Sequence, residues 1–230
     1  MDTTVDGYAH VRELMRRATG DEKHEESSTS TVDVVWALYD EVLRIDPAAP
    51  EAEHRDRFLL SKGHGPVALY AVLAAKGFFP ESWLDDFMDH GGHLGSHPDR
   101  TLVPGIEVST GSLGHGLSMG VGVALGLRAK HLVEQRVFVL CGDAELNEGS
   151  NWEAILLAPR LGLDSLTLVV VDNHSSSLAM GAWDARIGSF GWDARIVDGH
   201  DRAAIAEACL ARSSTGVPLA VIADIPEGEW

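Results

Sequence analysis

Cysteine is scarce in this chain: only Cys141 and Cys209 occur among its 230 residues. Both lie in apolar segments, which predicts reduced thiols in the core rather than a disulfide framework or a reactive nucleophile. A long uninterrupted apolar run is also missing, and the first ten residues carry acid instead of the basic flank of an export signal. We therefore expect neither a membrane span nor a secretory leader, and predict a cytoplasmic protein.

Basic residues are few as well. Eighteen lysines and arginines stand against 35 acidic residues, for a formal charge of −17. Such a charge repels phosphate backbones, so nucleic-acid and anionic-membrane partners are not expected. The length suits a single domain over residues 1–230, in which residues 1–30 form an N-terminal helix and a polar loop.

The most informative segment runs from Cys141 to Asn173. Residues 136–141 and 165–171 have the continuous apolar pattern of buried strands, and residues 148–163 between them have that of a helix. This βαβ unit places Asp143 and Asn173 at neighbouring strand ends, where open α/β sheets bind ligands. A carboxylate, an amide oxygen and a nearby backbone carbonyl suit Mg²⁺, so the spacing predicts a metal-diphosphate site. Two ordinary strand-ending turns would be the alternative.

Along the rest of the chain, segments with a helical pattern alternate with segments typical of strands, which predicts a mostly parallel α/β sheet with helices on both faces. The glycine-rich segment 114–133 still has the pattern of a helix, and its glycines predict the close approach of another backbone. Ser30 or Thr31 is expected to cap the helix that follows the polar loop. The expected helices are 8–18, 32–45, 64–77, 81–88, 114–133 and 201–212, and a last strand is expected at 218–225.

The 141–173 segment resembles the thiamine diphosphate motif, which begins Gly-Asp-Gly and ends with Asn about thirty residues later. The residues between the two ends of this motif are similar to those of transketolases. The resemblance continues, in the family's order, over most of residues 30–205. Four further motifs carry it: DRFLLSKGHG (56–65), LGSHPD (94–99), VPGIEVSTGSLGHGLSMGVGVALG (103–126) and VDGHD (197–201). The resemblance implies the fold of the family's diphosphate-binding domain.

The resemblance also implies thiamine diphosphate and Mg²⁺ as cofactors. Asp143, the Asn173 side chain and the Ser175 carbonyl would then bind the metal. The family has glycine where this chain has Ala144, which alanine tolerates if its φ is negative. The remaining cofactor-binding residues that the resemblance implies are Ser112, Leu113 and Gly114 beside the aminopyrimidine and diphosphate, Gly142 and Ala144 flanking the diphosphate, and His200 in contact with it.

Three histidines match the family's catalytic channel, where they polarise carbonyls and exchange protons with hydroxyls. His64 and His97 lie in matching motifs. His24 aligns with the first channel histidine, but charged and bulky residues replace its small neighbours. Either the loop over residues 21–29 has been retuned for another substrate, or His24 is merely solvated.

The resemblance finally implies the N-terminal subunit of a two-component transketolase-like enzyme, which moves a two-carbon ketol unit from a ketose to an aldose. The family's pyrimidine-binding and C-terminal domains would come from a separately encoded subunit, in an α₂β₂ assembly that binds sugar or sugar-phosphate substrates. Two alternatives stay open. One is a subunit of a 2-oxo-acid acyl transferase that uses a donor such as pyruvate, and the other is a non-catalytic scaffold subunit.

Overall fold

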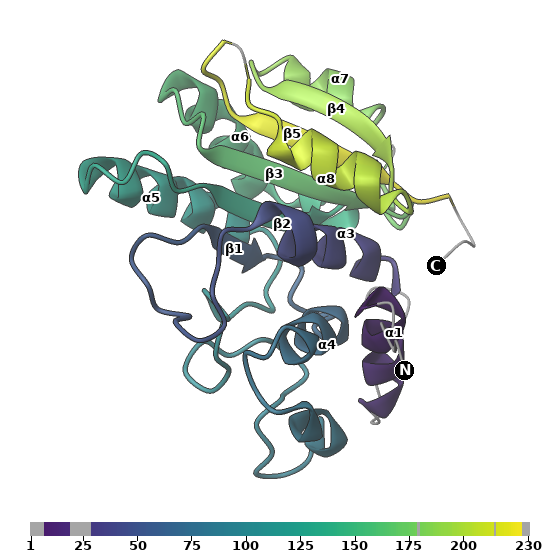
Figure 1. The fold of residues 1–230 in the computed structure, drawn as a ribbon. Helices are drawn as coiled ribbons and strands as arrows, with labels where there is room; N and C mark the ends of the chain where they lie inside the picture. The colour runs from purple at the N-terminus through teal and green to yellow at the C-terminus, as the bar shows by residue number, and fades with distance from the viewer. Residues whose placement is uncertain (1–6, 19–28, 179, 214, 227–230) are drawn as a thin grey trace.

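A five-stranded parallel sheet organises the computed structural model, which describes residues 7–18, 29–178, 180–213 and 215–226 (Figure 1). The strand order is β1-β2-β3-β5-β4, and every neighbouring pair is parallel. All five carboxyl ends therefore meet along one edge. The strands are β1 (Arg57–Leu60), β2 (Val137–Gly142), β3 (Leu166–Asp172), β4 (Asp193–Asp198) and β5 (Leu219–Asp224).

The apolar runs explain which strands lie inside. All six residues of β2 and the first six of β3 are buried, as expected for strands that are covered on both faces. Strand β4 lies at the sheet edge and is only partly buried. The predicted strands at 136–141, 165–171 and 218–225 are confirmed to within a residue at each end.

Alternate strand residues point into two apolar layers. On one face Phe138, Val169 and Val221 pack with α1 (Gly7–Arg17), α3 (Val32–Ala37), α4 (Val67–Ala75) and α8 (Arg202–Leu210). On the other face Val139, Val170 and Ile222 pack with α5 (Gly116–Ala129), α6 (Gly149–Arg160) and α7 (Trp183–Gly188). The predicted α/β sheet with helices on both faces is confirmed (Figure 1). Both cysteines are buried and free.

Some local predictions differ from the structure. The segment expected as a helix at 81–88 is a 3-10 helix, Glu81–Asp86, and the helix expected over 32–45 passes into a π-helical turn, Leu38–Val42. Thr31 occupies the N-cap position of α3 but its side chain makes no capping hydrogen bond. Helix α7 and strand β4 were not expected at all. Among the described residues no helix is long and apolar enough to cross a membrane.

Candidate functional site

Asp143 directly follows β2 and lies at the carboxyl edge of the sheet. Its side chain is 1% exposed, so its charge must be held by nearby donors. Ser175 Oγ donates to Oδ1 over 2.7 Å, and the backbone N–H of Ser176 donates to Oδ2 over 2.8 Å. The segment after β3 thus fixes the carboxylate from both sides. The predicted meeting of Asp143 with the residues after β3 is present in the structure.

Asn173 follows β3 and is also buried, with 8% of its surface exposed. Its amide nitrogen lies 3.5 Å from Ser30 Oγ, and no hydrogen bond to its amide oxygen is found within the described parts of the chain, so that oxygen could serve as a ligand atom. Ala144 begins a 3-10 helix, Ala144–Asn147, and its φ is not positive, so alanine fits where the family has glycine. Asp143, Asn173 and Ser175 therefore share one end of the β2–β3 pair.

Glu145 forms hydrogen bonds with three loops at this edge. The carboxylate is 1% exposed and accepts hydrogen bonds from Ser61 Oγ, from the Gly114 N–H over 2.9 Å and from the Gly142 N–H over 3.3 Å. Burial raises the pKa of Glu145 above its usual value. Sequence reasoning missed this residue, although an acid two positions after Asp143 at the end of a buried strand was a visible signal.

The loop Ser112–Gly114 is held against the same cluster. Gly114 has φ +85°, and a Cβ on it would lie 2.6 Å from Glu148 Cβ, so only glycine fits. Ser112 is exposed and Leu113 half-buried. Because Glu145 accepts from the N–H groups of both Gly114 and Gly142, the two glycine turns lie side by side.

His64 and His97 lie on neighbouring loops. Gly63 packs against Thr110, and a Cβ on Gly111 would lie 2.7 Å from the His97 ring. His64 is half-buried, whereas His97 is exposed and lies 3.1 Å from Ser96 Oγ through Nδ1. The structure therefore brings His64 and His97 to the loop at residues 110 and 111. His24 lies outside the described residues.

His200 follows β4 and is oriented by Asp33 of α3. The His200 Nδ1 lies 3.1 Å from Asp33 Oδ2, and Arg202 Nη1 lies 3.5 Å from the other carboxylate oxygen. Burial and a hydrogen bond to Asp33 raise the pKa of Tyr8 to about 12. Asp33 thus interacts with a tyrosine, a histidine and an arginine. The helical pattern of residues 32–45 gave no reason to expect these interactions.

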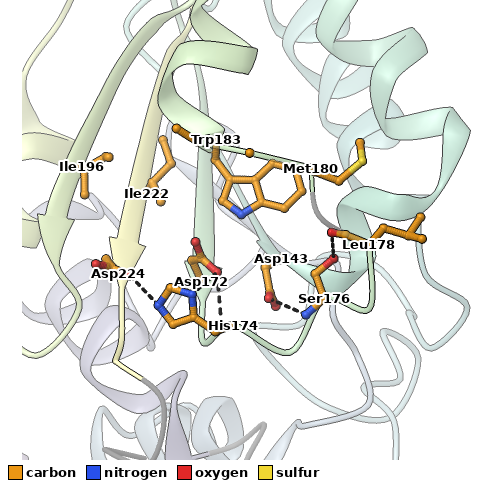
Figure 2. Close-up of a pocket in the computed structure, with 12 residues that line it drawn as sticks. Asp143, Asp172, His174, Ser176, Leu178, Met180, Trp183, Ile196, Ile222 and Asp224 are labelled. Atoms are coloured by element: carbon orange, nitrogen blue, oxygen red, sulfur yellow. Dashed lines mark hydrogen bonds and ion pairs between the residues drawn. The ribbon is translucent and has the colours of Figure 1, made fainter.

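A second polar group lies beside Asp143, at the ends of β3 and β5 (Figure 2). His174 has φ +57°, with Nε2 3.0 Å from Asp224 Oδ1 and Nδ1 3.8 Å from Asp172 Oδ1. Burial raises the pKa of Asp172. A cavity of about 430 Å³ extends from Asp143 past this group to the Trp183 ring.

Comparison with known proteins identifies the family. A model described as "Transketolase, thiamine diphosphate binding domain" matches residues 15–223, nearly the whole chain. The chain belongs to the transketolase family. The resemblance seen in the sequence is confirmed. The transketolase from Leishmania mexicana has the same fold, with a TM-score of 0.84 and 26% identity over 97% of this chain and 37% of that one.

Among curated relatives, an apulose-4-phosphate transketolase subunit from Actinobacillus succinogenes is 34% identical. The match covers 89% of this chain and 76% of that protein. The chain thus corresponds to most of one subunit of a divided transketolase but to little more than a third of a one-chain transketolase.

Another relative, "Ferredoxin fas2" from Rhodococcoides fascians, is 48% identical over 97% of this chain and 74% of that protein. Its name does not transfer to this chain. Ferredoxin clusters are held by four cysteine thiolates, whereas this chain has two cysteines, both buried. About a quarter of the relative lies outside the match.

The residues at the carboxyl edge fit a magnesium-bound diphosphate. The donor set of a carboxylate, an amide oxygen and a backbone carbonyl is one that Mg²⁺ accepts, with phosphate and water completing the octahedron. The carboxylate is already oriented by Ser175 and Ser176.

Proposed function

We propose that the chain is the N-terminal subunit of a two-component, thiamine-diphosphate-dependent transketolase that moves a two-carbon ketol unit from a ketose to an aldose. The observation that carries the proposal is the match to most of a separately encoded transketolase subunit, together with the buried and oriented Asp143. The protein would be active only when a partner completes the cofactor site.

Within this proposal the chain holds the diphosphate end of the cofactor. Asp143, the Asn173 amide oxygen and the Ser175 carbonyl would bind Mg²⁺, and Mg²⁺ would bind the diphosphate. Gly142 and Ala144 would flank the diphosphate. The other cofactor contacts that we propose are Ser112, Leu113 and Gly114 in the loop before α5 and His200 after β4.

When bound, thiamine diphosphate supplies a carbon nucleophile and stabilises the carbanion formed from the ketose. His64 and His97 would then polarise the sugar carbonyl and exchange protons with its hydroxyl groups. Their positions on adjacent loops beside residues 110 and 111 support a shared role. We propose the same role for His24.

The partner would be a separately encoded protein of the C-terminal transketolase type, in an α₂β₂ assembly located in the cytoplasm. The substrates would be small sugars or sugar phosphates. The relative from Actinobacillus succinogenes is named for apulose 4-phosphate, which supports a sugar phosphate. None of the observations favours the 2-oxo-acid or the scaffold alternative.

Donor competition tests the proposal. The chain is co-purified with the product of a neighbouring gene that resembles a transketolase C-terminal half, and is given Mg²⁺ and thiamine diphosphate. Ketol transfer from a ketose or ketose phosphate to an aldose is expected. Turnover of pyruvate with release of CO₂ instead would overturn the reaction proposed here, and cofactor binding without any transfer would do the same.

A further inference from the structure

Lys62 is the second residue after β1, at the level of the Gly142 turn on the neighbouring strand. Strands β1 and β2 pair through Leu60 and Leu140, so the chain continues past Ser61 to the carboxyl edge. A Cβ placed on Gly142 would lie 3.5 Å from Lys62 Cδ and 3.9 Å from Nζ. The ammonium group therefore lies against the turn that precedes Asp143.

The side chain is almost completely buried, with only 3% of the residue exposed. Throughout the described parts of the chain, no hydrogen bond and no ion pair within 4.0 Å is found for its ammonium group. Burial lowers the pKa of Lys62 to about 8, although Asp143 and Glu145 act in the opposite direction. Lys62 Nζ is not among the fully buried polar atoms that lack a partner in the described structure, so the ammonium keeps contact with solvent while most of the side chain is buried.

The two nearby carboxylates are already engaged. Asp143 accepts from Ser175 Oγ and from the Ser176 N–H. Glu145 accepts from a serine hydroxyl and from two backbone N–H groups. Neither carboxylate forms a direct ion pair with Lys62, so the ammonium retains all three of its donor hydrogens.

We propose that Lys62 is a diphosphate-binding residue, whose ammonium group donates to a phosphate oxygen beside Gly142. This inference rests on the function proposed above. Charge supports it, because the chain has a formal charge of −17 and two buried carboxylates face this edge. A diphosphate can enter such a field only if cations offset it, and a charge-assisted bond from an ammonium is a strong way to do so.

The test is calorimetric titration of thiamine diphosphate, with Mg²⁺, into the co-purified two-component complex. We expect Lys62→Met to weaken binding at least tenfold and Lys62→Arg to stay within about threefold of the wild-type Kd, because arginine restores the charge. Lys130→Met is the matched control, since Lys130 is exposed and pairs with Glu53. Its Kd should not change.

Thermal unfolding without cofactor separates binding from stability. If Lys62 serves the diphosphate, Lys62→Met keeps or raises the Tm of the cofactor-free complex, while the rise in Tm on adding cofactor shrinks. If Lys62 is only a counter-ion for Glu145, the cofactor-free Tm falls and the Kd stays within twofold, which overturns the proposal. A wild-type complex that does not bind thiamine diphosphate would overturn the proposed function as well.

Discussion

The carboxyl edge of the sheet carries two polar clusters that differ in how their charges are satisfied. In the Asp143 cluster (Asp143, Ser175, Ser176) a carboxylate that is 1% exposed accepts two hydrogen bonds from the chain after β3. In the His174 cluster (Asp172, His174, Asp224) the His174 and Asp224 side chains are each 47% exposed and pair with each other.

This difference separates a buried and oriented carboxylate, which we propose as a metal ligand, from a surface ion pair. Burial and donors fix the orientation of Asp143 before any metal arrives, which lowers the cost of binding. An exposed pair gains little because water screens it. The chemistry of the residues alone would not separate the two clusters, since an imidazole with two carboxylates is also a possible metal-binding set.

The largest expected effect is that of Asp143→Asn. It removes the charged metal ligand while keeping the size of the side chain, and should weaken Mg²⁺-dependent binding of thiamine diphosphate by more than about 100-fold, beyond the range of outer contacts. Titration calorimetry of the two-component complex measures it. The matched control is Asp224→Asn in the His174 cluster, for which the Kd should change by less than about threefold. Equal losses in the two variants would remove the distinction between the clusters.

A smaller effect is expected for Asp33→Asn. Asp33 contacts the His200 ring, so removing its charge should loosen a proposed diphosphate contact and weaken cofactor binding by about tenfold, as measured by the same titration. Because Asp33 acts through His200, Asp33→Asn should add little to the effect of His200→Ala in a double-mutant cycle. Full additivity would show that Asp33 acts on binding by another route.

Tyr8 provides a pH-dependent test of the same Asp33 group. Its pKa is raised to about 12 from 10.0, so the folded protein binds this proton more tightly than the unfolded chain does. The stabilisation is complete below pH 10 and is lost as the pH rises toward 12. Wild type should therefore lose more unfolding free energy than Tyr8→Phe when urea denaturation is compared at about pH 9.5 and pH 11. Parallel losses would contradict the burial of the Tyr8 hydroxyl against Asp33.

The smallest effect is expected in the His174 cluster. His174→Gly and His174→Ala both remove the ring, but only glycine accepts the positive φ without cost. In urea denaturation the glycine variant should be more stable by about 1 kcal/mol, and both should bind thiamine diphosphate within about twofold of wild type. A loss of cofactor binding in both variants would assign the His174 cluster to the cofactor site.

Helices and strands could be predicted from the sequence where one face, or both faces, of the segment are buried. The apolar runs of β2, β3 and β5 have few other interpretations, because both of their faces are covered. The pentapeptide WDARI shows the limit. It occurs at 183–187 as part of helix α7 and again at 192–196 in a segment that enters strand β4.

The two copies differ only in their surroundings. Ile187 is fully buried under the sheet, whereas Ile196 is 54% exposed and pairs with Ile222 of β5. Identical sequences have identical local propensities. The second copy therefore forms a strand because it hydrogen-bonds to the neighbouring strand β5. No interpretation of the pentapeptide alone could have predicted both.

The residues of the candidate site also differ in whether the sequence alone could place them. Asp143 and Asn173 could be brought together from sequence because they follow adjacent parallel strands. The contacts of Lys62, Glu145 and Asp33 could not be predicted, because their partners lie in segments distant in sequence. A charged residue inside an otherwise buried stretch, such as Lys62 after Leu59 and Leu60, was the available signal.

Titration calorimetry of thiamine diphosphate into this chain, alone and in complex with its C-terminal-type partner, tests the central claim most directly. We expect tight, Mg²⁺-dependent binding to the complex and much weaker binding to the chain alone, because the proposed partner would supply the other half of the site. Binding that is unaffected by Mg²⁺, or the absence of binding by the complex, would contradict it.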